Sequence, residues 1–218
     1  MPHAPEFTNR QQAGRALAAA LSEQTLDDPL ILALPRGGVP VGHEIAKVLR
    51  APLDILLVRK IGAPGHEEFA LGAVVDGAQP QWVVDEDALR RFAPPPGWFE
   101  QQVQAQLAEI ERRRALYCGP RQAQPLDGRD LVLVDDGLAT GSTVRVALKA
   151  IARQQPRRVL LAVPVGPRET VQRLGDEVDG LICLATPEPF YAVGNHYRDF
   201  TQVSDLEVMA LLAPAARA

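Results

Sequence analysis

The sequence predicts an α/β fold with a doubly wound, mainly parallel sheet and flanking helices. Short, continuous apolar runs such as Leu30–Leu34 and Leu131–Val134 are bounded by turn residues. Runs of this length without polar alternation are typical of strands buried on both faces of a parallel sheet. Amphipathic helical patterns alternate with these strands along the chain, which indicates βαβ units. The sequence contains no internal repeat and no low-complexity tract.

The first part of the chain supplies two core strands and their helices. In order, we expect a helix over 9–22, a buried strand over 30–34, a helix over 39–49 and a second buried strand over 53–58. Arg59 and Lys60 are expected at the carboxyl end of that second strand. Residues 62–68 are polar and punctuated by glycine, which predicts a mobile loop.

A different pattern follows between residues 71 and 125. Strands over 71–75 and 81–84 around Asp76-Gly77 predict a hairpin, and Asp85 can cap a short helix that ends at Arg91. A long, mostly polar helix then carries apolar residues at helical spacing: Phe99, Val103, Leu107, Ile110 and Tyr117. We expect it to cover the main body and expect residues 112–114, three arginines, to form a solvated face.

The last third returns to alternating strands and helices. We expect a strand over 131–134, a helix ending near 154, a strand over 159–163, a short helix over 169–174, a strand over 181–184 and a closing helix over 204–212. The whole chain, 1–218, is therefore expected to form one domain.

Composition excludes several functional classes. The 218 residues are 46% apolar and 23% charged, which is typical of a globular protein and not of a disordered one. The net charge of −4 provides no general basic field for nucleic acid. Two cysteines, Cys118 and Cys183, exclude a disulfide scaffold and a four-cysteine zinc site, so a cytoplasmic location is expected. No signal peptide is expected in residues 1–7, and no apolar run reaches the roughly 20 residues of a membrane helix.

Lysine is rare in this chain. Of the 23 lysines and arginines, only Lys47, Lys60 and Lys149 are lysine. A genome-wide codon bias is one explanation for the preference for arginine, and against such a background each remaining lysine calls for a local reason.

Ligands of open α/β sheets collect beyond the carboxyl ends of the strands. Residues 35–38, the Arg59-Lys60 pair and residues 135–143 are expected there. In the last segment, residues 140–143 (Thr-Gly-Ser-Thr) open a helix directly after a buried strand. Their free amide groups and hydroxyls can surround a phosphate. Neither the P-loop pattern nor the dinucleotide-binding glycine pattern occurs, and no hydrolase or metalloprotease motif is present.

Asp135 and Asp136 precede residues 140–143, which we call the phosphate cradle. Two carboxylates would repel a phosphate unless they face another group, such as the hydroxyls of a ribose or a magnesium ion. A sugar phosphate satisfies both halves of the motif. A purely structural explanation is also available: residues 135–137 (Asp-Asp-Gly) can form a turn, and residues 140–143 can cap the following helix. The contiguous order of strand, acidic pair, cradle and helix favours the ligand-binding interpretation.

The stretch 134–143 resembles the phosphoribosyl pyrophosphate (PRPP) signature of the type I phosphoribosyltransferases, and the resemblance covers about residues 29–165. It implies that Asp135 and Asp136 bind the ribose hydroxyls and that residues 139–143 (Ala139, Thr140, Gly141, Ser142 and Thr143) bind the 5′-phosphate. It also implies a pyrophosphate loop at Arg36, Gly37 and Gly38, with Pro35–Arg36 as the candidate for a non-proline cis peptide bond. The mobile catalytic loop of the family corresponds to residues 62–68, with Arg59 and Lys60 at its root.

The hairpin and the long helix are expected to form a cover insertion over about 71–125. The resemblance implies a base-covering hood, which we expect over about 185–203. Four aromatic residues of that hood are candidates for base stacking: Phe190, Tyr191, Tyr197 and Phe200. Burial in the core is the alternative for each of them. In the hypoxanthine-guanine branch the fifth signature position is an aspartate, whereas this chain has Ala139, as adenine-type enzymes do.

The implied reaction is Mg²⁺-dependent displacement of pyrophosphate from PRPP by a nitrogen acceptor, such as a nucleobase. Arg36, Arg59 and Lys60 are the candidate catalytic residues, with Mg²⁺ held mainly through PRPP near Asp135 and Asp136. The alternative is a regulator that senses PRPP or a nucleotide on the same fold without turnover. Nucleic acid and membranes are not expected as partners, and a homodimer is left open.

Overall fold

The computed structural model describes residues 6–77 and 80–213, and for residues 67 and 68 it describes only the backbone. Most of the N-terminal segment expected to lack a signal peptide therefore lies outside the described residues. The chain divides into two compact units, which are described separately. The parallel-sheet unit comprises Met1–Ile55, Leu126–Gly141 and Gln155–Ala218, and the antiparallel-sheet unit comprises Leu56–Pro125 and Ser142–Gln154.

The parallel-sheet unit contains a five-stranded sheet in the order β2-β1-β6-β7-β8, and every neighbouring pair is parallel. Its strands are β1 (Leu30–Ala33), β2 (Leu53–Ile55), β6 (Asp130–Val134), β7 (Arg158–Val165) and β8 (Gly180–Ala185). The central strands β1 and β6 are buried along their whole length, as the continuous apolar runs predict. The α/β fold class is confirmed.

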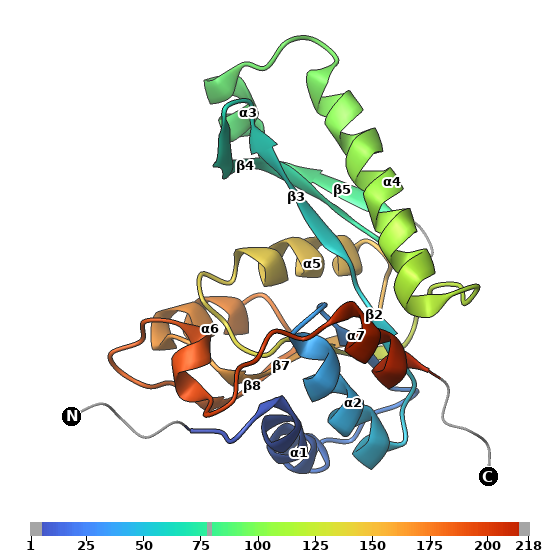
Figure 1. Ribbon diagram of the computed structural model, residues 1–218, viewed down its shortest axis with the longest axis vertical. Coiled ribbons are helices and arrows are strands. Elements are labelled where there is room, and N and C mark those ends of the chain that lie inside the picture. Colours follow the sequence, from blue (N-terminus) through green and yellow to red (C-terminus); the bar gives the residue numbers. More distant parts are fainter. Residues whose placement is uncertain (1–5, 78–79, 214–218) are drawn as a thin grey trace. The chain divides into compact units, whose positions relative to one another are not determined.

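The helices of this unit pack on the sheet or on one another. They are α1 (Arg10–Leu21), α2 (Gly38–Leu49), α6 (Arg168–Gly175), a 3-10 turn η1 (Val193–His196) and α7 (Asp205–Leu212). α1 and α2 lie side by side (Figure 1), and their apolar faces share one core cluster with β1, β6 and β7. Asn9 caps α1 by accepting a hydrogen bond from the Gln12 amide.

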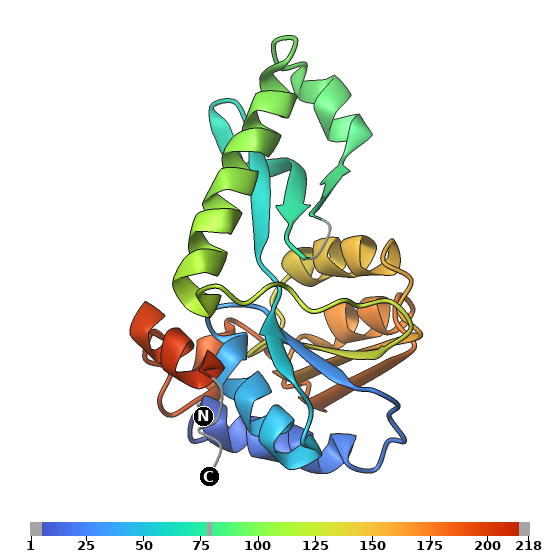
Figure 2. The same ribbon diagram turned by 90° about the vertical axis from the view of Figure 1, so that its right-hand side faces the viewer.

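The antiparallel-sheet unit contains the strands β3 (Val58–Ala63), β4 (His66–Val75) and β5 (Gln81–Val84) in that order. Its helices are α3 (Glu86–Phe92), α4 (Trp98–Cys118) and α5 (Ser142–Ala152). α4 runs along the strands of this sheet (Figure 2), and Phe99 near its start packs over Gly72 of β4. The predicted hairpin around Asp76-Gly77, the Asp85 cap and the long helix are confirmed.

Two expectations about this unit are wrong. The strand predicted over 53–58 ends at Ile55, and Val58 begins a strand of the other sheet. Residues 62–68 do not form a loop, because β3 and β4 pair as a hairpin around Pro64-Gly65. Gly62, one of the two glycines that suggested a loop, accompanies register shifts in the strand, where glycine is tolerated at bulges. The other, Gly65, lies in the hairpin turn with a φ of 71°.

Internal ion pairs stabilise each unit. In the antiparallel-sheet unit, Asp76 is 2% exposed, accepts a hydrogen bond from the Leu57 amide at 2.6 Å and pairs with Arg114 at 2.7 Å. Arg114 is therefore not part of the solvated face predicted for residues 112–114. Arg112 and Arg113 pair with Glu109 on the helix surface. Those two guanidinium groups lower the pKa of Glu109 to about 2.

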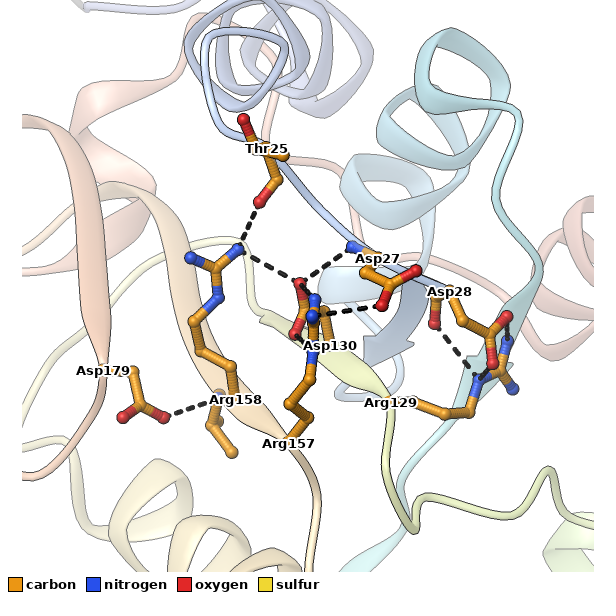
Figure 3. Close-up of polar contacts among 9 residues, drawn as sticks. Thr25, Asp27, Asp28, Arg129, Asp130, Arg157, Arg158 and Asp179 are labelled. Carbon is orange, nitrogen blue, oxygen red and sulfur yellow. Dashed lines mark hydrogen bonds and ion pairs between the residues drawn. The ribbon is translucent and has the colours of Figure 1, made fainter.

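A second network lies at the amino ends of β6 and β7 in the parallel-sheet unit (Figure 3). Asp130 is fully buried and accepts hydrogen bonds from Arg157, from Arg158 and from the Asp27 amide. These donors hold two strand ends and the segment before β1 around one carboxylate. The network therefore lies at the amino ends of the strands, whereas the predicted site lies at their carboxyl ends.

Candidate active site

The strand order places the predicted motifs between β1 and β6, where the chain changes the direction in which it adds strands to the sheet. From β1 the chain proceeds outward to β2, and from β6 it proceeds outward to β7 and β8. Ala33 and Val134, the last residues of β1 and β6, are paired. The turn Pro35–Gly38 and the acidic pair therefore leave neighbouring strands at the position where ligands bind open α/β sheets.

The turn after β1 packs directly on the acidic pair. A Cβ placed on Gly37 would lie 2.0 Å from Oδ2 of Asp136, and one placed on Gly38 would lie 2.7 Å from the Val134 carbonyl oxygen. Only residues without side chains allow the two segments to approach this closely. The Pro35–Arg36 bond is cis, which confirms the expectation at that position.

Asp136 is held by a charged partner that the sequence reasoning missed. Nε of Arg10 donates to Oδ2 of Asp136 over 2.8 Å, and NH1 of Arg10 donates to the Thr201 carbonyl oxygen. The guanidinium also lies 3.9 Å from the centre of the Phe200 ring, within the range of a cation–π contact. Arg10, Ala13 and Leu17 are buried at positions i, i+3 and i+7 of α1, so this spacing was the available signal.

The two carboxylates influence each other. The Asp136 amide donates to Oδ1 of Asp135 at 2.9 Å. Burial and the charge of Asp136 raise the pKa of Asp135 well above its usual range. Burial also raises the pKa of Asp136, and the hydrogen bond from Arg10 limits that rise. A ligand with hydroxyl donors, or a cation, would relieve this concentration of negative charge.

The predicted hood residues have different environments. Tyr197 is 5% exposed, and its hydroxyl donates to the Asp136 carbonyl oxygen at 2.7 Å. Its ring contacts Phe7 and Phe200, while Phe190 stacks on His196. Tyr191, by contrast, is 78% exposed. Of the four candidates for base stacking, three thus already make ring contacts within the protein, and Tyr191 has the accessible ring.

The loop that precedes α5 is anchored to α6. The Thr170 hydroxyl donates to the Ala139 carbonyl oxygen, and the Arg173 guanidinium donates to that of Thr140. Gly141 has a φ of 73°, and a Cβ there would lie 2.9 Å from Thr170. The conformation and the close packing both require glycine. Thr170 and Arg173, which the sequence did not suggest, hold the carbonyl groups so that the loop keeps one shape.

The predicted cations have separate partners. Arg36 pairs with Asp205, the first residue of α7, at 3.5 Å. Arg59 and Lys60 lie inside β3 and not at the carboxyl end of a parallel strand, which corrects the predicted position. Within the antiparallel-sheet unit, Arg59 donates to Gln106 at 3.0 Å and Nζ of Lys60 donates to Oγ of Ser142 at 2.7 Å.

Other titratable side chains have surroundings of their own. His66 lies beside Phe69 and Phe92 at the hairpin of the antiparallel-sheet unit. Cys118 and Cys183 are free thiols, and burial raises the pKa of Cys183 to about 11. Among the described residues no cluster of three or more histidine, cysteine or acidic side chains could hold a metal ion. Asp135 and Asp136 provide the oxygen ligands that Mg²⁺ prefers, and they fit an ion whose other ligands come from phosphate and water.

The similarity to known proteins is extensive. The protein-family model described as "Phosphoribosyl transferase domain" matches residues 6–183 of the sequence. The chain belongs to the phosphoribosyl transferase domain family. Among solved structures, TT1426 from Thermus thermophilus is 42% identical, covers 95% of this chain and is itself covered to 97%, with a TM-score of 0.82. The AQ2163 protein from Aquifex aeolicus, 15% identical with a TM-score of 0.51, covers 85% of this chain and is covered to 78%, and shares the fold alone.

Two curated relatives come from strains of Mycobacterium tuberculosis. "Putative phosphoribosyl transferase Rv0571c" and "Putative phosphoribosyl transferase MT0597" are each 43% identical to this chain over 97% of its length. The chain spans 47% of each relative, about half their length. In the part of this phosphoribosyl transferase chain that the structure describes, no helix is both long and apolar enough to cross a membrane.

Proposed function

We propose that this phosphoribosyl transferase domain binds PRPP with Mg²⁺ and transfers its phosphoribosyl group to a small nitrogen acceptor, releasing pyrophosphate. The acceptor is expected to be a nucleobase. The observation that carries the proposal is the packing of Gly37 and Gly38 against the segment 134–136. It brings the glycine turn proposed for pyrophosphate against the carboxylates proposed for ribose, and these groups are neighbours in PRPP.

The residues divide the substrate among them. Asp135 and Asp136 accept hydrogen bonds from the ribose hydroxyls and hold the ring while positive charge develops on it. Amide groups at Gly37 and Gly38, together with Arg36, bind the pyrophosphate. Residues 139–143 surround the 5′-phosphate, since the first amide groups of α5 have no helical partners. Bound Mg²⁺ neutralises charge on the departing pyrophosphate.

Lys60 belongs with the 5′-phosphate in this scheme. Its Nζ donates to Oγ of Ser142, one of the residues assigned to that phosphate. From the sequence, Lys60 was a candidate catalytic residue together with Arg36 and Arg59. We propose that Lys60 supports 5′-phosphate binding, while Arg36 acts on the pyrophosphate.

Binding is tested by titrating PRPP with Mg²⁺ into the wild type and into Asp135→Asn/Asp136→Asn by calorimetry. We expect the double variant to lose at least about tenfold in affinity, because neutral amides cannot replace two charged acceptors. The matched control is Asp127→Asn/Asp176→Asn, which removes two exposed carboxylates of the same unit and should bind as the wild type does. Equal binding by both double variants would contradict the assignment.

Turnover is tested separately. A panel of nucleobases and small amines is incubated with PRPP and Mg²⁺, and pyrophosphate release is measured. We expect at least one acceptor to stimulate release, and the acidic double variant to abolish it. Tight PRPP binding without release for any acceptor would support the sensing alternative, because binding alone suffices for a regulator.

A further inference from the structure

A cavity of about 370 Å³ lies within the antiparallel-sheet unit. This volume falls in the range that small-molecule sites occupy. Its lining comes from β3, β4, β5, the start of α3 and one face of α5. The proposed transfer reaction does not use most of these residues.

The floor of the cavity is a row of paired residues across the sheet. Lys60 pairs with Ala73, and Ala73 pairs with Val83, so the three residues share one face. Ala73 is fully buried, and its methyl group leaves space between its two larger neighbours. On the opposite wall, α5 contributes Ser142, Val146 and Lys149, at positions i, i+4 and i+7 of one helix face.

The charges of the lining are unevenly distributed. Two of the three lysines in the chain, Lys60 and Lys149, line this cavity. Lys60 is engaged with Ser142, whereas Lys149 makes no hydrogen bond or ion pair with other described residues. Asp85 and Glu86, at the start of α3, supply carboxylates to the same lining.

We propose that this cavity binds a small, planar organic anion in addition to the substrates of the transfer reaction. The acidic group of the ligand pairs with Lys149, and its planar apolar body lies between Val83 and Val146. An N–H or O–H group on that body donates to Asp85 or Glu86. Ser142 and Lys149 are seven positions apart on α5, about 10 Å, which accommodates one ring with a group at each end.

The class of ligand follows from the lining. A purely inorganic anion would leave the valines unused and would be repelled by the carboxylates. A neutral aromatic molecule would leave Lys149 unpaired, while an apolar acid without a donor would offer nothing to Glu86 or to the second oxygen of Asp85, whose Oδ1 caps α3. A ring that carries an acid at one end and a donor at the other satisfies all three features.

The probe is 4-aminobenzoate, titrated into the isotopically labelled full chain by NMR. We expect saturable shifts at the amides of Ala73, Val83 and Val146. 4-Aminobenzamide, the neutral isostere, should bind at least about tenfold more weakly, since it lacks the charge that Lys149 recognises. Benzoate, which lacks the donor, should also bind more weakly.

The decisive variant is Lys149→Met, which should weaken binding at least about fivefold, whereas Lys149→Arg should stay within about twofold. The third lysine, Lys47, lies outside the cavity, so Lys47→Met is the matched control. Val146→Phe fills the cavity and should abolish the shifts even if Lys149→Met folds poorly. PRPP affinity should be unchanged in Lys149→Met, so the outcome is independent of the proposed transfer reaction.

Three results would overturn the proposal. The first is the absence of saturable shifts up to about 10 mM 4-aminobenzoate, and the second is equal binding by wild type and Lys149→Met. The third is a set of shifts confined to residues 35–38 and 135–137 of the parallel-sheet unit. Weakened binding in Lys149→Met and Val146→Phe, with Lys47→Met unchanged, would support it.

Discussion

Nε of Arg10 lies 2.8 Å from Oδ2 of Asp136, so the first residue of α1 is the charged partner of a residue 126 positions later in the chain. The pair is largely buried, with side-chain exposures of 10% for Arg10 and 14% for Asp136. The same guanidinium also contacts Phe200 and Thr201. Arg10 therefore fixes both the position of the carboxylate and the segment that follows η1.

Arg10→Met should weaken PRPP binding by about tenfold or more, because it leaves a buried carboxylate without its charged donor. Arg10→Lys should recover part of the affinity, since it restores the charge but not the planar contact with Phe200. Calorimetry measures both. Arg15→Met removes an exposed cation from the same helix and should leave the affinity unchanged. If Arg15→Met weakened binding as much as Arg10→Met, a specific role for Arg10 would be untenable.

Gly37→Ala should reduce PRPP affinity at least about tenfold. The new methyl group would lie 2.0 Å from Oδ2 of Asp136, so either the turn or the carboxylate must move. Gly175→Ala, at the end of α6, meets no atom within 4 Å and should change neither binding nor stability by more than about 1 kcal/mol. Retained affinity in Gly37→Ala would show that this packing is unnecessary for binding.

Asp130→Asn should lower the free energy of unfolding by about 2 kcal/mol at pH 7. Burial alone would raise the pKa of Asp130, but the hydrogen bonds from Arg157 and Asp27 outweigh it and lower the pKa. A carboxylate with a lowered pKa stabilises the folded state above the pKa of the unfolded chain, about 3.9, and loses that contribution as the pH falls. The difference between wild type and Asp130→Asn should therefore shrink below about pH 4.

Urea unfolding at pH 7, 5, 4 and 3.5 measures this difference. Asp28→Asn is the control, because Asp28 is 69% exposed and forms a separate pair with Arg129 beside the Asp130 network (Figure 3). Its effect should stay below about 1 kcal/mol. A constant difference between wild type and Asp130→Asn across this pH range would contradict the proposed charge contribution.

Lys60→Met should raise KM for PRPP by about tenfold and leave kcat within about threefold, once an acceptor has been found. The contact of Lys60 with Ser142 indicates a bond to the 5′-phosphate, which does not change charge during the reaction. Steady-state kinetics separate the two constants, and Lys47→Met is the control. A fall in kcat of about 100-fold with an unchanged KM would instead support the catalytic role expected for Lys60 from the sequence.

Local patterns predicted the parallel sheet well. The continuous apolar runs of β1 and β6 specify burial on both faces, and the motifs that follow them are contiguous in sequence. The pairing of Ala33 with Val134 then brings two distant motifs together, as the fold class implies. The cis bond at Pro35–Arg36 followed from the resemblance alone.

Other features depend on contacts that no local pattern encodes. β3 extends through Gly62 because it pairs with β4 through a bulge, so glycine indicated a loop where a strand forms. Arg10 and Arg114 look like solvated helix residues until their buried partners, Asp136 and Asp76, are known. Tyr197 resembled a stacking residue, but its hydroxyl is committed to the main chain of Asp136.

The pairing of residues near the two ends of the described chain has a practical consequence. Phe7 bridges to Tyr197, its amide donates to the His196 carbonyl oxygen, and the Arg198 amide donates back to Phe7. A truncation that begins the protein at residue 11 would remove Phe7 and Arg10 while leaving every recognisable motif intact. Such a shortened protein would keep its signature and its sheet yet lose the support beneath Tyr197 and Asp136, so sequence motifs alone are an unsafe guide to where this domain can be trimmed.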